Sequence, residues 1–164
     1  MDSSLAFENE LAQLLPRLRR FAHSLSRNPS DADDLTQTTI ERALRSRDQW
    51  QEGTRLDSWT YRIMRNLWID TARSRSRKEK FEAPPEEAEF LGEDPTGAIE
   101  ASVELKRVMA AMERLPDDQR EVVALILIEG FGYRETSEML GLPIGTVSSR
   151  LVRGRTALLE MVGM

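Results

Sequence analysis

The stretch YRETSEMLGLPIGTVSSRLVRGRTALLEM, residues 133–161, decides the fold of the C-terminal half of the chain. A short helical segment runs to Leu140, Gly141 marks a turn, and a second helix opens near Pro143. This order of helix, turn and helix predicts a helix-turn-helix.

The second helix of this pattern has two different faces. At about 100° per residue, one narrow sector holds residues that we expect to pack inward: Val147, Leu151, Gly154 and Leu158. We expect Gly154 to let the neighbouring helix approach closely. The opposite sector holds hydroxyl and guanidinium groups: Thr146, Ser149, Arg153 and Thr156, with Arg150 and Arg155 at its flanks. Such groups fit the edges of bases in a DNA major groove. An ordinary amphipathic surface helix has the same pattern, so both interpretations stay open at this point.

Apolar stripes with the period of a helix also recur through residues 1–78, without an alternating strand pattern. We expect one helix over residues 11–25 and a second over residues 31–45 that Ser30 caps. A third helix follows a polar connector, residues 46–55. The inner stripe expected for it consists of Trp59, Ile63, Met64, Leu67 and Trp68. The sequence therefore predicts an all-helical protein.

Two more helices are expected ahead of the helix-turn-helix. An apolar stripe runs through residues 103–115 until Pro116 breaks it. Asp117 and Asp118 then open a helix around the apolar run 122–128. The side chains expected to pack from the first of these helices are Val103, Leu105, Val108, Met109, Met112 and Leu115.

Charge is distributed unevenly along the 164 residues. The net charge of −5 divides into +3 over residues 1–78, −6 over residues 79–97 and −2 over residues 98–164. The acidic middle stretch also holds three prolines and two glycines. We predict two small helical domains, 1–78 and 98–164, joined by an acidic, proline-containing linker. An ordered surface loop on a single domain is the alternative.

The composition excludes several kinds of site. The chain has no cysteine and one histidine, His23, so it has no disulfide, no thiolate nucleophile and no Cys/His zinc site. We expect no metal and no cofactor. A phosphate-binding glycine loop is absent too, which argues against a small enzyme. The apolar run 122–128 is too short to span a bilayer and no signal peptide pattern is present, so we predict a cytoplasmic protein.

Two parts of the chain resemble, in order, regions two and four of extracytoplasmic-function (group IV) sigma factors of bacterial RNA polymerase. Region two is matched by DADDLTQTTIERALR, residues 31–45, and LDSWTYRIMRNLWIDTARSRSRK, residues 56–78. Region four is matched by residues 115–155, which include the run GTVSSRLVRGR. The phrase LPDDQRE, residues 115–121, and the run GFGY, residues 130–133, favour the alphaproteobacterial general-stress subgroup.

This resemblance implies that each half binds a different promoter element. Region four is expected to bind the minus-35 element through Thr146, Ser149, Arg150 and Arg153, with Arg155 on a phosphate. Region two is expected to open the minus-10 element and to hold an unstacked base. The residues assigned to that task are Gln49, Trp50, Thr54, Asn66, Asp70, Arg73, Arg75 and Arg77. Trp50 can serve as a stacking platform, although an isolated tryptophan is more often a core residue.

The resemblance also implies that core RNA polymerase is a partner, through its beta-prime clamp and beta flap. We assign the clamp contact to the helix over residues 31–45. The residues concerned are Asp33, Asp34, Leu35, Gln37, Glu41 and Arg42. Carboxylates at a helix start also suit the helix dipole, and the two roles are compatible.

Two functions stay open at the level of sequence. The first is a promoter-specificity subunit without catalytic activity, held by an anti-sigma factor. The second is a sigma-like mimic that sequesters an anti-sigma factor without binding DNA. A mimic has no need of cations toward DNA, and the sequence carries Arg73, Arg75, Arg77, Arg150 and Arg153. These arginines favour the sigma factor.

Overall fold

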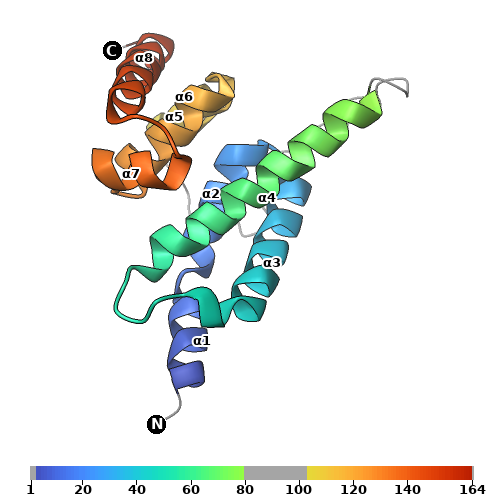
Figure 1. Ribbon diagram of the computed structural model, residues 1–164. Helices are drawn as coiled ribbons and strands as arrows, with labels where there is room; N and C mark the ends of the chain where they lie inside the picture. The colour runs from blue at the N-terminus through green and yellow to red at the C-terminus, as the bar shows by residue number, and fades with distance from the viewer. Residues whose placement is uncertain (1–2, 80–102, 164) are drawn as a thin grey trace.

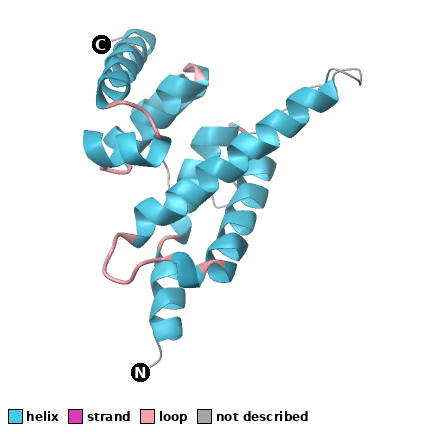
Figure 2. Ribbon diagram, in the orientation of Figure 1, coloured by secondary structure: helices cyan, strands magenta, loops and turns pink. Residues whose placement is uncertain are grey.

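The computed structural model describes residues 3–79 and 103–163, and every regular element in these two ranges is a helix (Figure 1, Figure 2). The N-terminal part contains α1 (Ser3–Gln13), α2 (Leu15–Ser26), α3 (Pro29–Arg45), the 3₁₀ turn η1 (Arg47–Gln49) and α4 (Leu56–Glu79). The C-terminal part contains α5 (Val103–Arg114), α6 (Asp117–Val123), the π turn η2 (Ala124–Ile128), α7 (Tyr133–Leu140) and α8 (Ile144–Val162). The predicted all-helical fold is confirmed for these residues. The predicted linker, residues 79–97, lies outside them except for Glu79.

No helix within either described range is both long enough and apolar enough to cross a lipid bilayer.

The first apolar stripe forms two helices, so the prediction of one continuous helix was wrong. The break lies at Leu14, between α1 and α2, and Pro16 occupies the first turn of α2. A proline has no amide hydrogen to donate and its ring clashes with the carbonyl four residues earlier, so it fits a first turn and not a helix interior. Leu18, Phe21 and Leu25 of the stripe are buried as expected.

The start of α3 also differs from the prediction. Asn28, not Ser30, caps the helix, and its side-chain oxygen accepts a hydrogen bond of 3.1 Å from the backbone amide of Asp31. Pro29 then occupies the first helical position, where its fixed φ angle favours the helix. Ser30 is therefore inside the first turn.

The long helix α4 buries more than the predicted stripe. Met64 is fully buried, and Thr60 and Tyr61, which the stripe did not include, are buried as well. The ring of Tyr61 lies 5.0 Å from that of Phe21 and 5.4 Å from that of Phe131, measured between centroids. Tyr61 therefore joins the N-terminal and C-terminal parts in one core. Figure 1 shows the last turns of α4 extending beyond α3.

The helix-turn-helix is confirmed by α7 and α8. Gly141 ends α7 with a φ of 66°, in the left-handed region that favours glycine. Val147, Leu151 and Gly154 form the buried face of α8. The predicted close approach at Gly154 is also present, because a Cβ atom built there would lie 2.8 Å from Cγ2 of Val123.

Helix α5 packs less completely than its stripe predicted. Met112 and Leu115 are buried, whereas Val103 is 75% exposed and Leu105 and Met109 are also exposed. Packing of α5 against α8 thus concentrates toward the end of the stripe. The α6 helix continues into the π turn η2, in which the amide of Glu129 donates to the carbonyl of Ala124 at 2.9 Å.

Replacing Gly154 with alanine tests this helix contact. Gly154→Ala forces Val123 or α8 to move, and overpacking of this kind costs about 1 to 3 kcal/mol. We expect the midpoint of urea unfolding to fall with an unchanged slope. Gly145→Ala is the matched control, since nothing lies within 4 Å of a Cβ there. Equal stability of the two variants would contradict the close approach of α6 and α8.

Candidate nucleic-acid interface

The outer face of α8 carries a prearranged set of hydrogen-bond donors. Ser149, Arg153 and Arg155 are exposed and Thr146 is half-buried. The Arg153 guanidinium donates to the Ser149 hydroxyl at 3.2 Å and to the Ser149 carbonyl at 3.3 Å. The Ser149 hydroxyl in turn donates to the carbonyl of Thr146 at 3.1 Å. These contacts hold the guanidinium along the helix, and its remaining donors stay available to a ligand.

Arg150 lies apart from this set. Its side chain is 25% exposed, and its Nε atom is 3.7 Å from a carboxylate oxygen of Asp118 at the start of α6. Arg150 therefore lies toward the groove between α4 and α6, which Arg65 and Arg73 also line. The five residues predicted to contact a minus-35 element thus lie on α8 but do not form one uniform surface.

The segment from the end of η1 to α4 brings two exposed polar residues beside a packed aromatic ring. Gln49 and Thr54 are exposed, and the Thr54 hydroxyl donates to the carbonyl of Gln51 at 2.6 Å. Trp50 is half-buried, and its ring centroid lies 5.5 Å from that of Phe7. Its indole Nε1 is buried and has no hydrogen-bond partner among the described residues. The role of Trp50 as a base platform stays a prediction.

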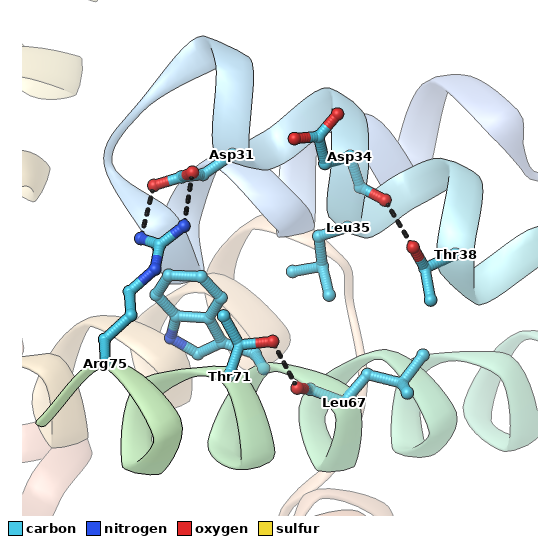
Figure 3. A pocket seen from close by; sticks show the side chains of 8 residues that line it. Asp31, Asp34, Leu35, Thr38, Leu67, Thr71 and Arg75 are labelled. Atoms are coloured by element: carbon cyan, nitrogen blue, oxygen red, sulfur yellow. Dashed lines mark hydrogen bonds and ion pairs between the residues drawn. The ribbon is translucent and has the colours of Figure 1, made fainter. Parts of the chain in front are cut away.

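The polar residues predicted on α4 separate into exposed and paired groups. Asn66, Asp70, Arg73 and Arg77 are exposed. Arg75 instead forms two hydrogen bonds with Asp31, of 2.7 and 2.8 Å, and its guanidinium lies 5.6 Å from the centre of the Trp68 ring. Figure 3 shows this pair at the edge of a groove of about 210 Å³ between α3 and α4. An arginine neutralised within the protein is less available to a phosphate.

The α3 residues predicted to contact polymerase also differ in exposure. Five of them form an exposed polar surface: Asp33, Asp34, Gln37, Glu41 and Arg42. Leu35 is only 6% exposed and faces the groove between α3 and α4 (Figure 3). Leu35 therefore contributes to packing within the protein.

Sequence reasoning missed a set of charged residues that join the two parts of the chain. Arg65 of α4 contacts Glu121 of α6 at 3.1 Å, and Arg62 donates to the carbonyl of Glu138 at 2.8 Å. Glu129 and Arg120 are buried at the same interface. Arg120 and Glu129 lie next to the apolar run 122–128 in the sequence, which is a signal that they are buried. Nothing in the local sequence identifies their partners.

The pair formed by Asp31 and Arg75 makes stability depend on pH. The hydrogen bond from Arg75 lowers the pKa of Asp31 below its ordinary value. A lowered pKa in the folded state stabilises the protein above the carboxyl's ordinary pKa, and this stabilisation is lost as pH falls through the folded value. Arg75 is half exposed, so we expect Asp31→Asn to cost only about 0.5 kcal/mol at pH 7.

Urea unfolding of wild type and Asp31→Asn between pH 7 and pH 3 measures this contribution. The difference between them should shrink toward the acid end. Asp33→Asn is the control, because it removes an exposed carboxylate from the same helix turn. A pH-independent difference would show that the ion pair is not its source.

The two parts of the chain match two parts of one protein family. Residues 11–78 match Sigma-70 region 2, and residues 105–158 match Sigma-70, region 4. The ECF RNA polymerase sigma factor EcfG of Rhodopseudomonas palustris (strain TIE-1) is 37% identical over 153 residues, which cover 93% of this chain and 83% of EcfG. The chain belongs to the ECF RNA polymerase sigma factors. As such a factor, it binds core RNA polymerase and promoter DNA.

Other similar proteins match nearly the whole of this chain. The ECF RNA polymerase sigma factor SigM of Mycobacterium tuberculosis is 31% identical over 158 residues, covering 96% of this chain and 78% of SigM. The sigma factor RpoE of Bartonella quintana, solved in complex with the anti-sigma factor NepR, superposes with a TM-score of 0.81 and 31% identity. That match covers 97% of this chain and 98% of RpoE. CnrH, solved in complex with the cytosolic domain of CnrY, has a TM-score of 0.67 and 25% identity, covering 96% and 88% of the two chains.

Proposed function

We propose that this ECF sigma factor directs core RNA polymerase to promoters of a stress response, and that it has no catalytic site of its own. In this proposal residues 1–78 bind the minus-10 element, residues 98–164 bind the minus-35 element and residues 79–97 link them. The observation that carries it is the outer face of α8, where Ser149 and Thr146 position the Arg153 guanidinium outside the packed helix. Since its polymerase and DNA are cytoplasmic in bacteria, we place the protein there.

The minus-10 role rests on the exposed face of α4 and on the connector. Asn66, Asp70 and Arg73 recur at spacings of four and three residues, so they share one face of the helix. Opening DNA costs about 1.4 kcal/mol per base-pair step. Stacking of an unpaired base on an aromatic ring contributes about 1 to 3 kcal/mol per base. Trp50 supplies that platform with the part of its ring that Phe7 leaves accessible, and Arg73 and Arg77 neutralise phosphates.

An anti-sigma factor is the regulator in this proposal. The relatives RpoE and CnrH were solved with an anti-sigma factor and with the cytosolic domain of CnrY. The general-stress assignment is supported by the resemblance of residues 115–121 and 130–133 to that subgroup. The exposed arginines Arg73, Arg153 and Arg155 support a sigma factor over a mimic that leaves DNA alone.

Transcription in vitro tests the proposed function directly. Purified core RNA polymerase should start RNA from specific sites on genomic fragments when this protein is added, and should not do so without it. Binding of an anti-sigma factor with no promoter-dependent RNA at any site would instead identify a mimic.

Replacing Arg153 tests the reading of the minus-35 element. Arg153→Ala should weaken binding by about 1 to 3 kcal/mol and relax discrimination at one base position if the guanidinium contacts a base edge. Gel-shift titration against single-base variants of a promoter fragment measures both effects. Arg114→Ala, which removes an exposed cation at the end of α5, controls for the lost charge. Uniform weakening on all sequences would reduce Arg153 to a phosphate contact.

The polymerase contact is tested by exposed residues of α3 alone, because Leu35 is buried. Asp34→Ala with Glu41→Ala removes two exposed carboxylates. We expect the affinity for core polymerase to fall at least tenfold, with helicity by circular dichroism unchanged. Asp48→Ala together with Glu52→Ala removes the same charge from the exposed connector as a control. Unchanged core binding would contradict the α3 assignment.

A further inference from the structure

Region four holds α2 of region two near its middle through a buried carboxylate. The Glu129 side chain is 1% exposed. It accepts hydrogen bonds from the Arg20 guanidinium at 2.7 and 2.9 Å, from the Tyr61 hydroxyl at 2.7 Å and from Arg17 at 3.3 Å. Burial acts to raise the pKa of Glu129, but the hydrogen bonds from Arg20, Tyr61 and Arg17, together with the charge of Arg20, outweigh it and lower that pKa. Glu129 therefore stays ionised and paired at neutral pH.

Region four also holds the last turn of α2, through a buried cation. Arg120 is 2% exposed. It donates to the carbonyl of Ser24, to that of Leu25 at 3.5 Å and to that of Leu115 at 2.7 Å. A guanidinium suits the negative end of the α2 dipole, where carbonyls lack partners within the helix. Glu129 and Arg120 thus contact two separate points along α2 from the same α6–η2 segment.

An apolar contact lies between these two points. The rings of Phe21, Tyr61 and Phe131 follow one another with centroids 5.0 and 5.4 Å apart, and they belong to a core that contains residues of both regions. A buried ion pair contributes little net stability, because its attraction is offset by the hydration that both partners lose on burial and regain when the surfaces separate. Such pairs fix the register of an interface while leaving it able to open.

This closed arrangement conflicts with promoter binding by both regions. Arg73 and Arg150, assigned to different promoter elements, line one groove of about 440 Å³. The positions −10 and −35 that name the two elements differ by about 25 base pairs. At 3.4 Å per base pair this separation is roughly 85 Å. Two side chains at one groove do not reach both elements, so the regions must separate first.

We propose that Glu129 and Arg120 form an intramolecular clasp that holds the free sigma factor closed and competes with promoter binding. The clasp consists of these two residues of region four and their partners Arg17, Arg20, Tyr61, Ser24 and Leu25 of region two. Its effect on DNA binding rests on the proposed function. Release of the clasp frees α4 and α8 to bind their separate elements.

A change of charge on the exposed side of the clasp tests it without disturbing a core residue. Arg20→Glu places a carboxylate against Glu129, and the Arg20 side chain is 48% exposed, so region two should still fold. Arg20→Glu with Glu129→Arg restores an opposite pair. Glu113→Lys is the control, since the side chain of this interface carboxylate is 44% exposed and its pair with His23 should contribute little.

Energy transfer between two dyes measures closure, because the chain has no cysteine of its own. Labelled cysteines at Glu52 and Glu138 report it, since Arg55 pairs with Glu135 and Arg62 contacts the Glu138 carbonyl in the closed form. Unlabelled proteins are titrated with a duplex holding both elements, without polymerase. We expect Arg20→Glu to lower transfer and raise DNA affinity about fivefold or more. The double variant should reverse both changes, and Glu113→Lys should match wild type.

Each contrary result overturns the clasp. Equal transfer in wild type and Arg20→Glu would show that this pair does not hold the regions together. Opening without a gain in DNA affinity would show that closure does not compete with promoter binding. The proposed function fails separately, by the absence of promoter-dependent RNA with core polymerase, while the dye measurement still reports whether the chain is closed.

Discussion

Tyr61 makes an apolar contact with its ring and a hydrogen bond with its hydroxyl. Both contacts link region two to region four. The ring packs between Phe21 of region two and Phe131 of region four. The hydroxyl donates to Glu129, whose carboxylate is out of contact with water. Burying a carboxylate without hydrogen-bond partners is destabilising. The packing of α6 and η2 that buries Glu129 therefore also requires the hydrogen bonds from the arginines of α2. The groove between α4 and α6 follows from that arrangement.

Arginine serves two different purposes in this protein, and burial separates them. Arg120 is enclosed and satisfies carbonyls, while Arg153 and Arg155 are exposed on α8. Arg75 lies between these cases, because it is exposed and yet paired with Asp31. A net charge of −5 is therefore compatible with a nucleic-acid interface, since the cations that matter are the exposed and unneutralised ones.

A closed state and an open state also give a regulator a simple way to act. A partner that binds only the closed arrangement stabilises it in proportion to its concentration and affinity. A partner that binds only separated regions, such as polymerase together with a promoter, has the opposite effect. The clasp needs only a small net stability for either partner to change the outcome, and buried ion pairs supply an interface of that kind.

The sequence by itself determined the all-helical architecture, the helix-turn-helix, the close approach at Gly154 and the exposed face of α8, because helix periodicity and turn chemistry are local properties. It also contained the break at Pro16, which was missed because the apolar stripe continues through it. Tertiary structure alone decided that Glu129 pairs with Arg20, which is 109 positions away. The reason is physical: which charges lose their water depends on how distant helices pack, and no local pattern encodes that choice.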